Sequence, residues 1–150
     1  MHLNRIDELL IHSTDPVRVP LMGQTLCAGF PSLADDFVED ALELPRWLVP
    51  NPRATFLRRI AGSSMEGAGI YGRDPACIDR SLKAAHGSIV VAAIDGQMSC
   101  KRLVIAGNVA RLAFCNPDLP AFAVEELGEG VIWGVVRFSI RWHVARGQMS

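Results

Sequence analysis

The chain has 150 residues, of which 49% are hydrophobic and 21% are charged, and its formal net charge at pH 7 is −1. This size and apolar content predict one globular domain with a core and argue against a second full domain. The charge balance lacks the basic excess typical of proteins that bind DNA directly, so no direct sequence-specific DNA binding is expected and a protein partner is favoured.

The cysteines and acidic residues give no indication of a metal site or a cofactor. The four cysteines form no CxxC pair and have no metal-ligand spacing with the histidines; they are Cys27, Cys77, Cys100 and Cys115. Such thiols are typical of a reducing cytoplasm, and no disulfide is predicted. Asp74 and Asp79 flank a predicted turn and strand without a third ligand, so they are expected to be solvated or to cap turns.

The hydropathy argues against a membrane protein. The first residues include Arg5, Asp7 and Glu8 in place of an apolar signal core, and the longest apolar run covers only residues 89–94. A membrane span needs roughly 20 apolar residues. A membrane-anchored secretory signal peptidase is therefore disfavoured, and a cytoplasmic location is expected.

Residues 1–28 are expected to form an arm. Asn4 is suited to cap a short helix, but Pro16 and Pro20 are expected to stop any long element. The segment is too short and too rich in proline for a helix-turn-helix DNA-binding domain, which needs about three helices. An ordinary frayed terminus is the alternative interpretation.

The rest of the chain predicts a mainly β fold. Residues 36–44 fit either a strand with alternating apolar positions or the start of a helix, and Pro45 is placed to open a single helical turn. Further strands are indicated by β-branched and apolar runs between Gly, Asn, Asp and Pro. They cover residues 54–60, 76–78, 88–94, 97–103, 109–114 and 131–143.

A turn of small residues, 61–70, carries the adjacent hydroxyls of Ser63 and Ser64. A serine is a weak nucleophile until a base accepts its proton, and a lysine can be that base when burial lowers its pKa. Lys101 follows the Asp95-Gly96 hairpin signal, whereas the guanidinium of Arg102 stays protonated and is excluded as a base. A Ser64–Lys101 dyad is therefore a hypothesis.

The surroundings of this candidate dyad leave two interpretations open. On the strand predicted at residues 97–103, Ser99, Lys101 and Leu103 share one face, so Lys101 faces inward if Arg102 faces solvent. Glycines flanking the serines would leave backbone N–H groups free to stabilise an oxyanion. The competing interpretation is an ordinary Gly-Ser loop beside a solvated lysine on a hairpin.

Several short motifs occur in the order and at the separations of one peptidase family. They are Gly29-Phe30-Pro31-Ser32, Asp36-Phe37-Val38-Glu39, Gly62-Ser63-Ser64-Met65, Gly69-Ile70, His86-Gly87-Ser88-Ile89-Val90 and Asp95-Gly96 with Lys101. Together they resemble the LexA/UmuD group of self-cleaving serine–lysine peptidases over about residues 29–143. The chain departs from that group at residues 71–75, where Arg73 and Pro75 replace a Gly-Asp followed by apolar strand residues.

The resemblance implies a fold, a site and a substrate. The fold is a β-clip with a flexible N-terminal arm. Ser64 is the nucleophile, Lys101 is the general base, and the backbone amides of Ser63 and Ser64 form the oxyanion site. The scissile bond joins Ala28 to Gly29, so residues 1–28 are an arm removed by self-cleavage and residues 29–150 are the peptidase domain. The small Ala28 and Gly29 let the peptide lie extended across a serine.

The resemblance also implies a function in the SOS response. RecA–single-stranded DNA filaments would stimulate self-cleavage, and the processed homodimer would join a UmuC-type Y-family DNA polymerase in error-prone translesion synthesis. Two alternatives stay open. One is a LexA-type transcriptional regulator that lacks its DNA-binding domain, and the other is a non-cleaving β module that only binds a partner.

Overall fold

The computed structural model describes residues 15–23, 38–94, 97–116, 118, 124–126 and 131–144. Within these residues nine strands form one mixed sheet, in the order β2-β1-β3-β4-β9-β5-β6-β7-β8. The strands are β1 Val17–Met22, β2 Val38–Leu44, β3 Thr55–Arg59, β4 Pro75–Asp79, β5 Ile89–Ile94, β6 Gln97–Ala106, β7 Val109–Ala113, β8 Val124–Glu126 and β9 Ile132–Ser139. The 3-10 turns η1 Arg46–Leu48, η2 Pro52–Ala54 and η3 Glu66–Ala68 connect them. The mainly β prediction is confirmed.

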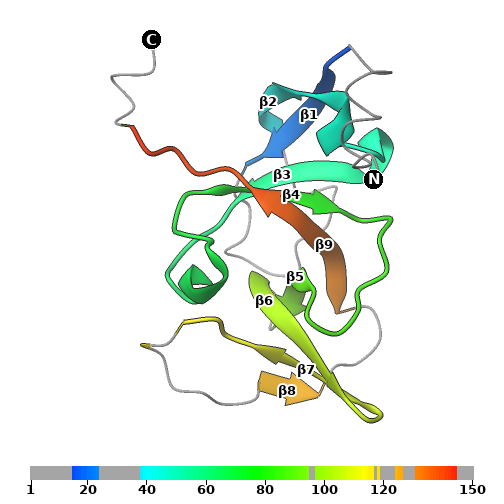
Figure 1. Ribbon diagram of the computed structural model, residues 1–150, viewed down its shortest axis with the longest axis vertical. Coiled ribbons are helices and arrows are strands. Elements are labelled where there is room, and N and C mark those ends of the chain that lie inside the picture. Colours follow the sequence, from blue (N-terminus) through cyan, green and yellow to red (C-terminus); the bar gives the residue numbers. More distant parts are fainter. Residues whose placement is uncertain are drawn as a thin grey trace, which may run out of the picture.

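Strand β9 joins two halves of the sheet, as Figure 1 shows. One half contains β1 to β4 and the other contains β5 to β8, and β9 pairs antiparallel with β4 on one side and with β5 on the other. Both ladders are irregular, since the register shifts between Cys77 and Ile78 and between Val91 and Ala92. Such irregularities bend and twist a sheet. The bend at β9 therefore sets one half of the sheet at an angle to the other.

Each half has its own apolar core. Val19, Leu57 and Cys77 belong to the cluster on the β1–β4 side, and Val90 and Leu112 belong to the cluster on the β5–β8 side. These side chains follow the period of two along their strands, which places alternate residues on one face. A third cluster contains buried Met65, Ile70 and Cys100 and connects the turn after β3 to β6.

Most of the predicted elements occur, with different ends. Residues 36–44 contain strand β2, so the strand interpretation is right, and η1 follows Pro45 as the single predicted turn. The last strand stops at Ser139 and not at residue 143. In the part of the chain that the structure describes, no helix is long and apolar enough to cross a membrane.

Strand β1 lies within the segment that was expected to form an arm. Residues 17–22 pair along their whole length with β2, and Val17, Val19 and Leu21 are buried. Pro16 and Pro20 were expected to stop any long element, and β1 is a short strand of six residues whose ladder with β3 begins only after Pro20. The proline, which lacks an N–H, is therefore paired on one side only. The described part of the predicted arm is thus a strand of the sheet.

The loop that departs from the family pattern forms a tight turn. Arg73 has a left-handed backbone, with φ of 74°, and its N–H donates to the carbonyl of Ile60 at 2.7 Å. The Asp74 carboxylate accepts a hydrogen bond from the N–H of Tyr71 at 3.0 Å. Pro75 then begins β4 and pairs with Arg59. The departure therefore leaves the following strand intact.

Replacing Arg73 by glycine is expected to stabilise the protein by about 1 kcal/mol, because a left-handed backbone is strained for residues with a Cβ. Urea unfolding followed by circular dichroism would measure this change. Arg73→Ala is the matched control, since it removes the same side chain but keeps the Cβ, and it is expected to give no gain. Equal stabilisation by both variants would show that the side chain, and not the backbone angle, is the cause.

Candidate active site

Ser64 lies in a turn that is fixed from both sides. Its neighbour Met65 is fully buried and packs in the cluster that contains Cys100. The carbonyl of Ser64 accepts a hydrogen bond from the N–H of Cys115 at 2.8 Å, and the N–H of Gly67 donates to the carbonyl of Cys115. A Cβ on Gly67 would lie 2.5 Å from that carbonyl oxygen, so the close approach requires glycine. Residues on both sides of Ser64 are therefore anchored to Cys115.

The carbonyls of Ser63 and Ser64 accept hydrogen bonds, whereas among the described residues their own amides donate none. The Ser63 carbonyl accepts hydrogen bonds from the Asn116 side chain at 2.5 Å and from the N–H of Glu66 at 3.2 Å. Within the residues that the structure describes, the N–H groups of Ser63 and Ser64 donate to no acceptor. Free backbone donors beside a serine are what an oxyanion site requires. The geometry is compatible with the predicted oxyanion role of Ser63 and Ser64.

Lys101 is buried on β6, and its amine is held from several directions. Its Nζ donates to Ser99 Oγ at 2.5 Å and to the Cys100 carbonyl at 3.2 Å. The same nitrogen lies 4.5 Å from the centre of the Phe114 ring. Arg102 is exposed, so the two residues lie on opposite faces of the strand, as alternation requires. Of the two interpretations left open, the structure has the one with Lys101 facing inward.

Burial lowers the pKa of Lys101 from its ordinary value of 10.5, because a charged ammonium loses solvation in the protein interior. The neighbouring Cys100 acts in the opposite direction on the lysine. Burial also raises the pKa of the Cys100 thiol to about 11, so this cysteine is neutral at pH 7. Lys101 is thus the group in this site that burial shifts toward a neutral base.

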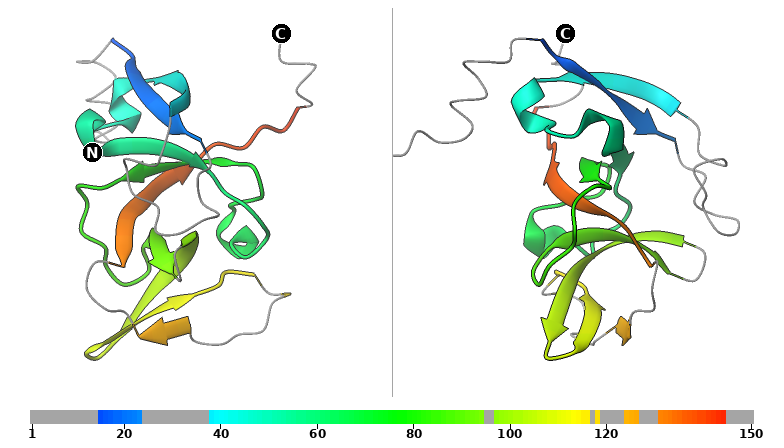
Figure 2. Two further views of the ribbon diagram at one scale, coloured as in Figure 1. Left: turned by 180° about the vertical axis from the view of Figure 1, so that it is seen from behind. Right: turned by 90° about the vertical axis from the view of Figure 1, so that its right-hand side faces the viewer.

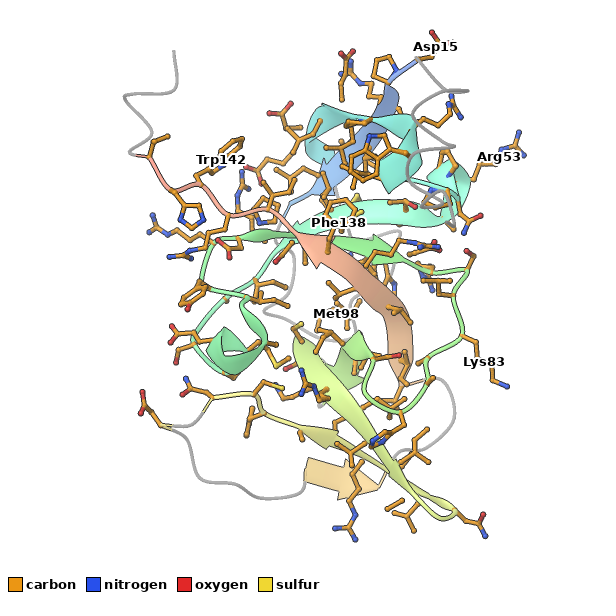
Figure 3. The ribbon with its side chains drawn as sticks, viewed as in Figure 1. Asp15, Arg53, Lys83, Met98, Phe138 and Trp142 are labelled. Atoms are coloured by element: carbon orange, nitrogen blue, oxygen red, sulfur yellow. The ribbon has the colours of Figure 1, made fainter. Side chains whose placement is uncertain are left out.

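A pocket of about 90 Å³ connects the turn to the lysine strand. Ser64, Met98 and Ser99 are among its lining residues, and Ser99 accepts the hydrogen bond from Lys101. Met98, labelled in Figure 3, lies between the two halves of the sheet. Among the described contacts, no hydrogen bond joins Lys101 Nζ directly to Ser64 Oγ. Ser64 and Ser99 thus line the same pocket, and Lys101 is linked to that pocket by its hydrogen bond to Ser99.

A wider groove leads into this pocket. It has a volume of about 840 Å³, and Glu39 at the beginning of β2 is part of its wall. Arg59, Ile60 and Ala61 line both the groove and the Ser64 pocket. Arg59 Nη1 donates to both carboxylate oxygens of Glu39, at 2.7 and 2.6 Å. The groove therefore extends from β2 to the residues that also line the Ser64 pocket.

Sequence reasoning missed several residues that shape this site. Cys115 and Asn116 form hydrogen bonds to the backbone of the serine turn. The turn is far from them in the sequence, and no sequence pattern signals such contacts. Arg58 lines the pocket although it is only 3% exposed, and its guanidinium lies 4.7 Å from the centre of the Trp133 ring. Ser99 was placed on the lysine face by strand alternation but was given no role. The predicted cleavage residues, Ala28 and Gly29, lie outside the described residues.

Comparisons with known proteins agree with these motifs. The Peptidase S24-like family matches residues 20–137. The chain is 40% identical to protein MucA of Salmonella typhimurium over 126 residues, which are 83% of this chain and 86% of that protein. It is 37% identical to protein SamA of Salmonella typhimurium strain LT2 over 130 residues, 85% of this chain and 90% of that protein.

A second kind of relative is the LexA repressor of Clostridium kluyveri, which is 36% identical over 110 residues. This match covers 73% of the chain and 54% of the repressor. The chain therefore belongs to the Peptidase S24-like family, in the LexA/UmuD group that its motifs predicted, and its bent sheet is the β-clip of that family.

Proposed function

We propose that the protein is a UmuD-like SOS-response protein that cuts its own chain between Ala28 and Gly29. The observation that supports this function best is that Ser64 and Ser99 line one pocket, while Lys101, which is buried and has a lowered pKa, donates a hydrogen bond to Ser99. A neutral lysine beside a serine is the activated nucleophile that peptide cleavage needs. Family membership supports the same chemistry.

The proposed reaction uses only groups of this chain and water. Neutral Lys101 accepts the proton of Ser64 as its Oγ attacks the carbonyl carbon of Ala28. The amides of Ser63 and Ser64 stabilise the oxyanion, and the Lys101 ammonium gives its proton to the leaving amine of Gly29. Water then hydrolyses the acyl-enzyme, with Lys101 again accepting a proton. The products are residues 1–28 and residues 29–150.

The topology supports delivery of this substrate to Ser64. The scissile bond belongs to residues 23–37, which connect the end of β1 to the beginning of β2. Met22 at the end of β1 pairs with Val38 at the start of β2, so both ends of the connection leave the same place in the sheet. Glu39, the next residue, lines the groove that leads to the Ser64 pocket. The connection therefore begins beside the groove that adjoins the Ser64 pocket.

The partners and cellular role of the proposal come from the resemblance. RecA–single-stranded DNA filaments would promote the cleavage-competent state in the cytoplasm. The processed homodimer of residues 29–150 would then act with a UmuC-type Y-family polymerase in translesion synthesis. The similarity to proteins MucA and SamA over more than four fifths of the chain supports this role over that of a LexA-type regulator.

Intact-mass spectrometry after incubation with RecA filaments, and separately at alkaline pH, tests the proposal. We expect two new masses that correspond to residues 1–28 and 29–150. Operator-specific DNA binding by the uncut protein would instead favour a LexA-type regulator. An unchanged mass under both conditions would leave a binding module without peptidase activity and would defeat the proposal.

Ser99 is expected to position the Lys101 amine. Removing its hydroxyl in Ser99→Ala should slow self-cleavage by about tenfold, which is the rate effect expected from losing one hydrogen bond to a charged or polar group. Ser99→Thr keeps the hydroxyl and should restore most of the rate. Rates measured by gel densitometry across pH 7 to 11 would also show an altered pH midpoint in Ser99→Ala. An unaltered rate and midpoint would remove Ser99 from the mechanism.

A further inference from the structure

Strand β1 is bonded on both sides although it precedes the bond that the proposed function would cut. Its residues Val17 to Met22 pair antiparallel with β2, and Leu21 and Met22 also pair in parallel with β3. Figure 2 shows β1 and β2 side by side at one end of the molecule. The strand therefore fills a slot between β2 and β3.

The apolar face of β1 completes a core. Val17, Val19 and Leu21 belong to the same buried cluster as Leu57 of β3 and Cys77 of β4, and Val19, Leu57 and Cys77 are 0% exposed. Arg18, between the first two valines, faces solvent. The alternation gives the strand one face that binds the core and one that does not.

Strand β2 depends on β1 for its place in the sheet. In the strand order, β2 is hydrogen-bonded to β1 alone among the described strands. The Glu39–Arg59 ion pair links β2 to β3 beyond β1, because Met22 pairs with Val38 on one side and with Arg58 on the other. The Glu39–Arg59 ion pair thus lies at the end of the slot where the chain leaves β1.

Cutting the chain between Ala28 and Gly29 would break the connection between β1 and β2 but none of these contacts. We propose that the slot between β2 and β3 is a strand-binding site that retains residues 17–22 as a non-covalent peptide after cleavage. This inference rests on the proposed function. Once the covalent connection between β1 and β2 is cut, retention of the fragment depends on concentration. The fragment that contains β1 then dissociates on dilution or by exchange with a competing strand. Its departure would expose Leu57 and the inner edge of β2.

A chain cut by an added protease tests retention without relying on self-cleavage. The Ser64→Ala protein would carry a site-specific protease sequence inserted between Ala28 and Gly29. After cutting, gel filtration at micromolar concentration with mass spectrometry of the main peak is expected to show both fragments together. Excess synthetic peptide of residues 15–23 should displace the smaller fragment. A wild-type chain that fails to cut itself would count against the proposed function alone.

Matched variants of the cut chain show which contacts retain the strand. Val19→Ser removes a fully buried apolar group and should weaken retention at least about tenfold, whereas Arg18→Ser should leave it unchanged. If the Val19→Ser chain does not fold, labelled peptides of residues 15–23 with and without this change can be compared for binding to the cut parent chain. Complete separation of the fragments, with the larger one folded by circular dichroism and neither peptide bound, would overturn the inference.

Discussion

Ser64→Ala is expected to reduce self-cleavage at least about a thousandfold, because the variant retains the pocket but has no nucleophile. Ser63→Ala is the matched control: it deletes the adjacent hydroxyl, leaves the backbone amide in place, and should cleave at nearly the parent rate. Intact-mass spectrometry over a time course measures both. Cleavage that is lost in Ser63→Ala and retained in Ser64→Ala would reassign the nucleophile.

Lys101→Ala is expected to have a similarly large effect, and its controls separate the base from the charge. Lys101→Arg keeps a positive charge that cannot be given up in the working pH range, so it should also be inactive. Lys83→Ala removes an exposed lysine and should leave cleavage unchanged. An active Lys101→Arg protein would show that the site needs a cation and not a base.

The pH dependence follows from the lowered pKa of Lys101. Below this pKa the ammonium cannot accept the Ser64 proton, so the cleavage rate should rise with pH as the neutral lysine forms. The midpoint should lie below the ordinary value of 10.5 because burial disfavours the ammonium. Rates between pH 6 and 11 would locate it. A midpoint at or above 10.5 would contradict activation by burial.

The candidate dyad was accessible from the sequence because its signals are local. The hydroxyl pair in a glycine-rich turn, the hairpin dipeptide and the period of two around Lys101 all depend on neighbouring residues. The position of Ser99 on the same face as Lys101 follows directly from that period, whereas which of the two faces is buried does not. The anchoring of the serine turn to Cys115 does not, because it joins backbone atoms that are far apart in the sequence.

Strand β1 shows what the local signals did not reveal. The run Val17–Met22 alternates apolar and polar residues until Pro20, but the sequence predicted only that Pro16 and Pro20 stop any long element. In the folded sheet, β3 reaches β1 only after the proline, so the missing N–H removes no bond on that side. Whether Pro20 is tolerated depends on where the ladder with β3 begins. The position of that ladder cannot be predicted from residues 17–22 alone.

Asp79 departs most clearly from the solvated or capping role expected of it. Its side chain is 0% exposed and accepts hydrogen bonds from Asn51 Nδ2 at 3.0 Å, from Arg137 Nε at 2.9 Å, and from both the N–H and the hydroxyl of Ser81. The bond to the Ser81 N–H is the capping part of the expectation, and it holds. The bonds to Asn51 and Arg137 join distant segments at the junction of β4 and β9.

Asp79→Ala is expected to destabilise the fold by about 3 kcal/mol, because it leaves the partners of a buried carboxylate without an acceptor. Urea unfolding would measure the loss. Asp40→Ala is the matched control, since Asp40 is exposed on β2 and, among the described residues, accepts a hydrogen bond only from the adjacent N–H of Ala41. It should cost less than about 0.5 kcal/mol. Equal losses of unfolding free energy in the two variants would show that the hydrogen bonds of Asp79 do not stabilise the fold more than an exposed carboxylate does.

The acid sensitivity of the protein should change with the same residue. Burial alone would raise the pKa of Asp79, but hydrogen bonds from Ser81, Asn51 and Arg137 outweigh burial and lower the pKa from 3.8 to about 2. A depressed pKa means that the unfolded chain binds the proton more tightly, so the stabilisation is complete above pH 4 and is lost as the pH falls toward 2.

Asp79→Asn removes that titration while keeping one oxygen acceptor. The difference in unfolding free energy between the parent and this variant should therefore shrink by about 2 kcal/mol between pH 5 and pH 2. The parent should lose stability in this range more steeply than the variant. Parallel stability curves for the two proteins would mean that Asp79 is not ionised in the folded state, and the β4–β9 junction would then be held by neutral hydrogen bonds.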